Sequence, residues 1–217
     1  MIPRIKICCI SSPEEARMAV QFGAAALGLV GPMPSGPGVI SDELIATIAR
    51  LAPPAVGTFL LTSETDALAI ADHHRKVMTN TIQIVDKLES GQYQDIRANI
   101  GAVKLVQVIH VMDESSIEEA LALESQVDAL LLDSGNPTLQ VKELGGTGRT
   151  HNWEISRRLV EAVSIPVFLA GGLKAENVRE AIETVQPFGL DLCSGVRTDG
   201  HLDPFKLERF FKAAFRG

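Results

Sequence analysis

The residues best suited to chemistry stand where short aliphatic runs end. Lys6 and Cys8 lie in the first run, Ile5–Ile10, and Asp133 ends a later one. Because strand side chains alternate between two faces, Lys6 and Cys8 share one face, and the neighbouring isoleucines share the other with Cys9. A lysine about 6–7 Å below a thiol favours its thiolate, which is a base. A carboxyl at the end of a buried run can stay protonated and act as an acid.

Both residues also have a purely structural interpretation. A buried cysteine is most often an inert core residue, and this reading applies to Cys8 taken alone. Asp133 directly precedes Ser134 and Gly135, so its carboxylate could instead stabilise a turn.

Two glycine-containing segments also follow aliphatic runs. The first contains Gly171 and Gly172, and the second contains Ser194, Gly195 and Val196. Glycines let backbone N–H groups approach an anion closely, whereas a single such loop is often an ordinary turn. Two of them after successive runs favour a phosphate site.

The elements that must position these residues alternate regularly along the chain. Eight aliphatic runs predict strands: Ile5–Ile10, Ala25–Val30, Val56–Leu61, Thr81–Val85, Val103–Val111, Val127–Leu132, Ile165–Ala170 and Phe188–Cys193. The segments between and after them predict helices: Pro13–Phe22, Ser41–Arg50, Glu64–Lys76, Ser90–Ile100, Ser115–Leu123, Asn152–Val163, Ala175–Thr184 and Asp203–Phe215. Such alternation indicates an α/β fold with a parallel sheet.

Eight strands in 217 residues favour a single-domain (β/α)8 TIM barrel that spans residues 1–217. An open doubly wound sheet is the alternative, but no Gly-x-Gly-x-x-Gly motif follows the first strand. In a barrel of this kind the active site lies at the carboxyl ends of the strands, where the candidate residues above are found.

Composition narrows the possible partners. The net charge is −7 with no basic cluster, which argues against nucleic acid and a membrane surface as partners. No apolar run approaches the ~20 residues of a membrane span, and we expect no secretory leader, because the first residues show no long apolar segment before a cleavage site. The odd count of three cysteines argues against a disulfide framework, so we expect a reducing, cytoplasmic location.

The histidines do not predict a metal site. None of the five pairs at ligand spacing with a cysteine or a carboxylate at a strand end. His73 and His74 are adjacent in a predicted helix, where we expect a solvent-exposed face.

The order of several motifs resembles that of the phosphoribosylanthranilate isomerase family. The motifs are Lys6-Ile7-Cys8, Ser12-Pro13-Glu14-Glu15-Ala16, Gly23–Gly28, Val56-Gly57-Thr58-Phe59, Leu131-Leu132-Asp133-Ser134, Gly145-Gly146-Thr147-Gly148, Leu169–Val178 and Asp191–Val196. They extend over both ends of the chain, so the resemblance identifies a divergent member of that family with a TIM-barrel fold.

The resemblance implies an enzyme, an intramolecular oxidoreductase (aldose–ketose isomerase) of tryptophan biosynthesis. The implied reaction is the Amadori rearrangement of an N-(5-phosphoribosyl) arylamine, with Cys8 as general base and Asp133 as general acid. It requires no metal or organic cofactor, and a phosphosugar is the implied small-molecule partner. We expect the two glycine loops to bind the phosphate, and the remaining substrate-lining residues to be Lys6, Gln83, Gly146, Arg149 and Asp191. The oligomeric state is expected to be a monomer or a homodimer.

The chain departs from the family pattern at the anthranilate end. The loop Gly31–Gly38 lacks the arginine that binds the anthranilate carboxylate, and Gln83-Ile84-Val85-Asp86 lacks the histidine that normally ends strand four. Cys9 and His151-Asn152-Trp153 replace a glycine and Phe-Asp-Trp. Arg149 could supply a substitute cation. Two alternatives therefore stay open: another phosphosugar isomerase or epimerase with a non-anthranilate substrate, and a non-catalytic phosphometabolite-binding protein.

Overall fold

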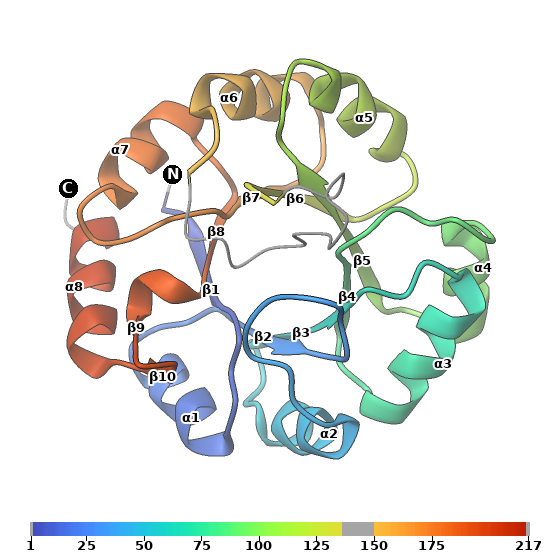
Figure 1. Cartoon of the computed structure of the whole chain (residues 1–217), viewed down its shortest axis with the longest axis horizontal. Helices are drawn as coiled ribbons and strands as arrows, with labels where there is room; N and C mark the ends of the chain where they lie inside the picture. Colours follow the sequence, from blue (N-terminus) through green and yellow to red (C-terminus); the bar gives the residue numbers. More distant parts are fainter. Residues whose placement is uncertain (1, 136–149, 216–217) are drawn as a thin grey trace.

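The strands of the computed structural model, which describes residues 2–135 and 150–215, form a closed parallel barrel (Figure 1). Its members in chain order are β1 (Arg4–Ile7), β2 (Ala26–Val30), β3 (Gly57–Thr62), β4 (Thr81–Ile84), β5 (Lys104–His110), β6 (Ala129–Asp133), β7 (Val167–Leu169) and β8 (Gly189–Leu192). Each strand pairs with the next, and β1 also pairs with β8, which places Lys6 opposite Asp191. The predicted TIM barrel is confirmed.

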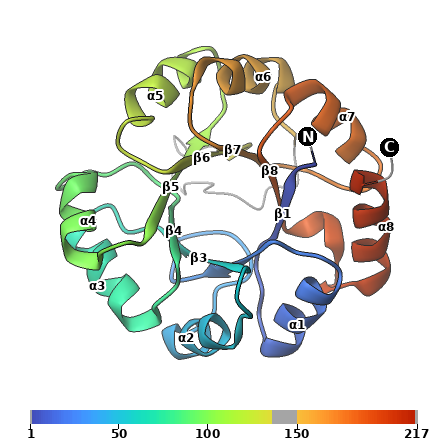
Figure 2. The same ribbon diagram turned by 180° about the vertical axis from the view of Figure 1, so that it is seen from behind.

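A ring of helices surrounds the barrel in both views (Figures 1 and 2). The helices are α1 (Pro13–Gln21), α2 (Asp42–Leu51), α3 (Ala67–Val77), α4 (Tyr93–Ile100), α5 (Ser115–Leu123), α6 (Trp153–Ala162), α7 (Val178–Val185) and α8 (Pro204–Phe215). After β8 the chain forms a short 3-10 turn, η1 (Ser194–Val196), and a small hairpin of β9 (Arg197–Thr198) and β10 (His201–Leu202). This hairpin lies between α8 and α1 in Figure 1.

Local capping explains where the helices begin. The Ser12 hydroxyl accepts a hydrogen bond from the N–H of Glu15, and Pro13 follows at the first helical position of α1. Asp66 caps α3 in the same way through the N–H groups of Leu68 and Ala69. Helix α3 therefore begins three residues later than the sequence predicted, because the Asp66 carboxylate ends the preceding loop.

Two apolar cores stabilise the barrel. The outer core lies between strands and helices and contains Ile5 and Ile7, as alternation along β1 predicted. The inner core fills the barrel and contains Cys8, with Phe59 packed edge-on against Phe168. Cys9 also belongs to this inner cluster, so its predicted outward direction is wrong. The reason is that Cys9 lies beyond the end of β1 with φ of 60°, which breaks the alternation.

The predicted solvent-exposed face at His73 and His74 is also wrong. Both side chains are buried between α3 and its neighbours. His73 contacts the Asp42 carboxylate of α2 at 3.0 Å, and His74 Nε2 lies 2.6 Å from the Thr79 carbonyl oxygen. They connect α3 to adjacent segments of the fold.

Candidate active site

A cavity opens at the carboxyl ends of the barrel strands. Its wall includes Cys8 and Asp133, which come from the ends of β1 and β6 and are separated in the ring by β7 and β8, together with Gln83 and Asp191. The sequence placed all four at strand ends or on inward faces, and the structure brings them around one space.

Cys8 stands at the rim directly after β1. Its N–H donates to the carbonyl of Leu192 at 2.7 Å, which ties the residue to the end of β8. Room for its side chain depends on Gly28 of β2. A Cβ at that position would lie 2.8 Å from Cys8 Sγ and 3.0 Å from Lys6 Nζ, so the thiol and the ammonium group share the space above one glycine.

Lys6 lies below the cavity rather than in its wall, in contrast to the predicted substrate-lining position. The side chain is fully buried, with Nζ 2.8 Å from Asp191 Oδ1 and 5.3 Å from the centre of the Phe59 ring. Burial opposes its charge, but Asp191, and to a smaller degree Cys8, raise the pKa of Lys6 above its usual value. A permanent positive charge therefore stands close to the Cys8 thiol.

Asp133 ends β6 in register with His110 of β5. Its carboxyl is buried and accepts a hydrogen bond from the N–H of Ser134 at 2.7 Å. Burial raises the pKa of Asp133, although the Ser134 N–H and His110 oppose that shift. This upward direction of the pKa is the one that a general acid requires, because it makes the carboxyl keep its proton to a higher pH.

Gln83 projects from β4 into the same cavity. The side chain is buried, and its Oε1 atom has no hydrogen-bond partner in the part of the chain that the structure describes. Burial of a hydrogen-bond acceptor without a partner costs free energy of folding. A residue that keeps such an atom beside a cavity is suited to bind a ligand there.

The loops after β7 and β8 meet at one side of the cavity. Gly171 and Gly172 adopt φ values of 82° and 60°, which favour glycine. A Cβ on Gly195 would lie only 2.0 Å from the Leu173 carbonyl oxygen, so the two loops touch backbone to backbone. Asn177 stabilises the first loop by donating to the Gly172 carbonyl and accepting from the Lys174 N–H.

The predicted phosphate residues are therefore close together, with one difference. Gly171, Gly172, Ser194 and Gly195 line the cavity, whereas Val196 does not, because its side chain packs into the outer core. Gly146 and Arg149, the other predicted substrate-lining residues, lie outside the described residues.

Two cysteines without a predicted role also line the cavity. Cys9 and Cys193 face it beside Cys8. Hydrogen bonding with Cys193 and Cys8, together with burial, raises the pKa of Cys9 well above its usual value, so Cys9 stays a neutral thiol. For Cys9 the sequence signal was its adjacency to Cys8, although alternation pointed its side chain the wrong way. For Cys193 the signal was its place at the end of the eighth predicted strand, on the same face as Asp191.

Another part of the wall comes from the loop after β2 and the end of β4. It is formed by Met33, Ser35, Gly36, Pro37 and Val85, and no lysine or arginine lines the cavity among residues 2–135 and 150–215. The sequence showed that the loop Gly31–Gly38 carries no arginine for a carboxylate. In the structure, this part of the cavity wall is largely apolar. The described residues also contain no group of three or more histidine, cysteine or acidic side chains that could hold a metal ion.

Comparison with known proteins covers nearly the whole chain. The family model for N-(5′-phosphoribosyl)anthranilate (PRA) isomerase matches residues 5–213. The N-(5′-phosphoribosyl)anthranilate isomerase of Methanocella arvoryzae is 32% identical over 208 residues, covering 96% of this chain and 95% of that protein. Isomerase 2 of Methanosarcina mazei is 36% identical over 213 residues, covering 97% and 93%.

Solved structures agree with these sequence matches. The phosphoribosyl anthranilate isomerase of Thermotoga maritima superposes with a TM-score of 0.80 at 29% identity, covering 98% of each chain. A second isomerase structure, in complex with reduced 1-(o-carboxyphenylamino)-1-deoxyribulose 5-phosphate, has a TM-score of 0.77 at 28% identity and the same coverage. The chain therefore belongs to the N-(5′-phosphoribosyl)anthranilate isomerase family.

Proposed function

We propose that the chain catalyses the Amadori rearrangement of N-(5′-phosphoribosyl)anthranilate, an aldose–ketose isomerisation in tryptophan biosynthesis. Family membership over residues 5–213 supports the reaction. The single observation that carries it is the cavity in which Cys8 and Asp133 face one space beside two joined glycine loops.

Asp133 is the general acid in this proposal. It donates its proton to the furanose ring oxygen while the bond from that oxygen to the first sugar carbon breaks. The nitrogen lone pair then completes a Schiff base at that carbon. The raised pKa of Asp133, caused chiefly by burial, keeps a proton available for this step.

Cys8 is the general base. Its thiolate removes the proton from the second sugar carbon, and the resulting enolamine tautomerises to the ketone. The buried Lys6 ammonium places a positive charge beneath Cys8, and Asp191 keeps that ammonium charged. The whole sequence transfers only protons, so it needs no metal or organic cofactor.

Backbone N–H groups of the loops after β7 and β8 are the proposed phosphate site. Gly171, Gly172, Ser194 and Gly195 line it, and their glycines allow close approach to an anion. A phosphate held there fixes the sugar relative to Cys8 and Asp133, which lowers the entropic cost of reaching the transition state. Gln83 would accept a hydrogen bond from a substrate hydroxyl or N–H group.

The apolar wall at Met33, Pro37 and Val85 favours a second candidate, the same rearrangement on a different arylamine. Loss of a charge-assisted carboxylate contact costs ~1.5–3 kcal/mol, or about one to two powers of ten in affinity.

Arg149 and Gly146 remain predicted substrate contacts. The cytoplasmic location and the monomeric or homodimeric state also remain predictions. None of the helices in the described part of the chain has the length and apolar character that a membrane crossing requires.

The decrease of anthranilate fluorescence on mixing the protein with freshly made substrate tests the proposal. We expect turnover in the parent protein and a loss of about 10²–10⁴-fold in kcat for Cys8→Ser and for Asp133→Asn. Asp72→Asn, an exposed carboxyl on α3, is the matched control and keeps the parent rate. Absence of turnover at micromolar protein would exclude the isomerase function.

The two alternatives need measurements of their own. A higher kcat/KM for N-(5-phosphoribosyl)aniline than for the anthranilate compound identifies a different arylamine as the substrate. Tight phosphosugar binding that Cys8→Ser and Asp133→Asn leave unchanged, without turnover, identifies a non-catalytic binding protein.

A further inference from the structure

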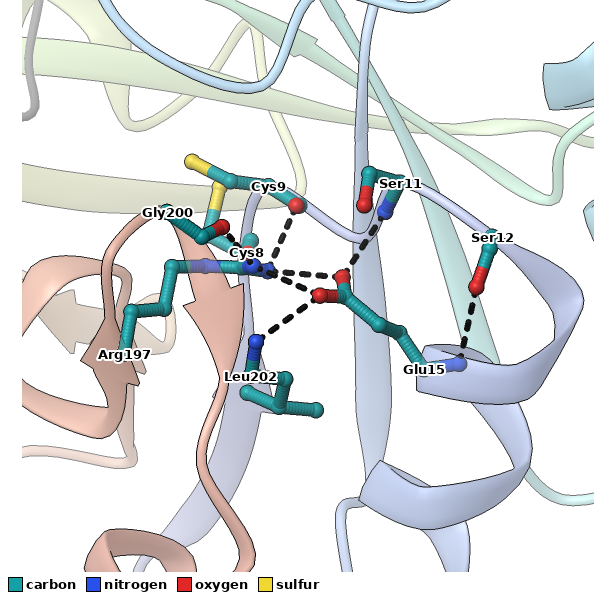
Figure 3. A network of polar contacts seen from close by, with 8 residues as sticks. All are labelled: Cys8, Cys9, Ser11, Ser12, Glu15, Arg197, Gly200 and Leu202. Atoms are coloured by element: carbon teal, nitrogen blue, oxygen red, sulfur yellow. Dashed lines mark hydrogen bonds and ion pairs between the residues drawn. The ribbon is translucent and has the colours of Figure 1, made fainter.

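A buried ion pair lies against the turn that carries Cys8 and Cys9 (Figure 3). Arg197 approaches from β9, and Glu15 approaches from α1. Their two nitrogen–oxygen contacts measure 2.9 and 3.1 Å, and each residue is only 8% exposed. The two residues are 182 positions apart in the sequence, so the pair joins the first helix of the barrel to the segment after β8, the last barrel strand.

The same guanidinium group binds the backbone of the turn. Arg197 Nη2 donates to the carbonyl oxygens of Cys9 at 2.5 Å and Cys8 at 3.2 Å, and Nη1 donates to the Gly200 carbonyl at 2.9 Å. The planar fork of arginine, with its five N–H donors, allows one side chain to contact these three carbonyl oxygens and both oxygens of a carboxylate together.

Glu15 completes the network from the other side. Besides Arg197, its carboxylate accepts from the N–H of Ser11 at 3.0 Å and of Leu202 at 2.8 Å. The turn is thus held from both ends, at Cys8–Cys9 through Arg197 and at Ser11 through Glu15.

The turn needs such support because of its conformation. Cys9 has φ of 60°, in the left-handed region that side-chain-bearing residues rarely adopt. Strain of this kind persists only where surrounding contacts over-determine the backbone. The loop after β2 also packs closely on the cysteine, since a Cβ on Gly38 would lie 2.5 Å from the Cys9 Cβ.

We infer that Arg197 and Glu15 are positioning residues that hold the strained Cys8–Cys9 turn and so aim the Cys8 thiol into the cavity. This inference rests on the proposed role of Cys8. Neither residue lines the cavity, so their effect on the reaction passes through the turn. A displacement of about 1 Å at a reacting group is enough to cost about 10²-fold in rate.

Two conservative variants test the inference. Arg197→Lys keeps the charge but loses the fork, and Glu15→Gln keeps the shape but loses the charge. We expect kcat to fall about tenfold or more in each, with KM within about twofold of the parent, because the phosphate loops are untouched. Arg97→Lys is the matched control, since Arg97 also contacts a carboxylate and a carbonyl but at the other end of the barrel. It keeps the parent kcat.

A double-mutant cycle separates positioning from general loss of stability. Glycine adopts the left-handed conformation without strain, so Cys9→Gly should make the turn less dependent on Arg197. We expect Arg197→Lys to cost about threefold or less in kcat in the Cys9→Gly protein, against about tenfold in the parent. Equal losses in both backgrounds, or a folded Arg197→Lys protein with the parent kcat, would overturn the inference.

Alkylation of Cys8 by iodoacetamide, followed by peptide mass analysis, provides a readout that does not need turnover. Release of the turn exposes a thiol that is 6% accessible in the parent, so Arg197→Lys should raise the Cys8 alkylation rate at least about threefold. The rise should be smaller in the Cys9→Gly background. If the parent lacks isomerase activity, the proposed function fails, and equal alkylation rates in parent and variant would separately refute the positioning role.

Discussion

Lys6 and Asp191 form an ion pair inside the barrel, with 2.8 Å between Nζ and Oδ1 and Lys6 wholly shielded from solvent. The pair joins β1 to β8, where the barrel closes, and lies under the Cys8 thiol. One contact therefore serves both the closure of the fold and the electrostatics of the proposed base.

Removal of one partner of this pair should be strongly destabilising. We expect Lys6→Met to lower the free energy of unfolding by about 3–5 kcal/mol, because the Asp191 charge stays buried without its partner. Lys104→Met is the control, since Lys104 is largely exposed in its pair with Asp128 and should cost at most about 1 kcal/mol. Urea denaturation measures both, and equal effects would contradict the expectation.

Asp133 should stabilise the protein less at neutral pH than an uncharged residue of the same shape. Its folded pKa lies above the unfolded value, so the stability it contributes is complete below about pH 4 and is lost as the pH rises through the folded pKa. We therefore expect Asp133→Asn to have a higher Tm than the parent at pH 7. The difference should disappear as the pH falls to about 4. A lower Tm of the variant at pH 7 would show that burial of the Asp133 carboxyl does not destabilise the folded protein at that pH.

The inner face of β1 and the end of β6 were predictable because alternation and strand ends are local features. Cys8 and Asp133 follow from these two rules, and the resemblance supplied their proposed roles. The contact of Lys6 with Asp191 was not predictable from either run alone, because it depends on the closure of β1 against β8. Sequence spacing contains no direct measure of that closure.

Arg197 illustrates a second limit. It follows Val196 at the end of a recognised motif, yet nothing local indicates that it reaches Glu15 and the Cys9 carbonyl. Val196 was assigned to the phosphate loop because its neighbours are, but the 3-10 turn directs its side chain into the outer core. Backbone turns after a strand therefore determine which residues of a motif face the cavity.

Gly195 should be irreplaceable at the contact between the two glycine loops. A methyl group there meets the Leu173 carbonyl at 2.0 Å, so Gly195→Ala must separate the loops. We expect KM to rise about tenfold or more, equivalent to ~1.4 kcal/mol of binding, and inorganic phosphate to protect the variant less against heat. Gly101→Ala is the control, because no atom lies within 4 Å of a Cβ at that position and the change adds only backbone strain. An unchanged KM in Gly195→Ala would place the phosphate elsewhere.

Gln83 and Gln107 are buried on adjacent strands, but only Gln83 should matter for substrate. The Gln83 Oε1 atom has no partner among the described residues, whereas the Gln107 amide is fully used by Tyr93 and three carbonyl groups. We expect Gln83→Met to keep or raise the Tm, because it removes an unpaired buried acceptor, and to raise KM about tenfold, which is ~1.4 kcal/mol of lost binding. Gln107→Met should do the reverse, with a stability loss of about 1–3 kcal/mol and an unchanged KM. Thermal unfolding and steady-state kinetics on the two variants measure this contrast. A Gln83→Met protein with lower stability and the parent KM would show that the amide serves the fold instead of the substrate.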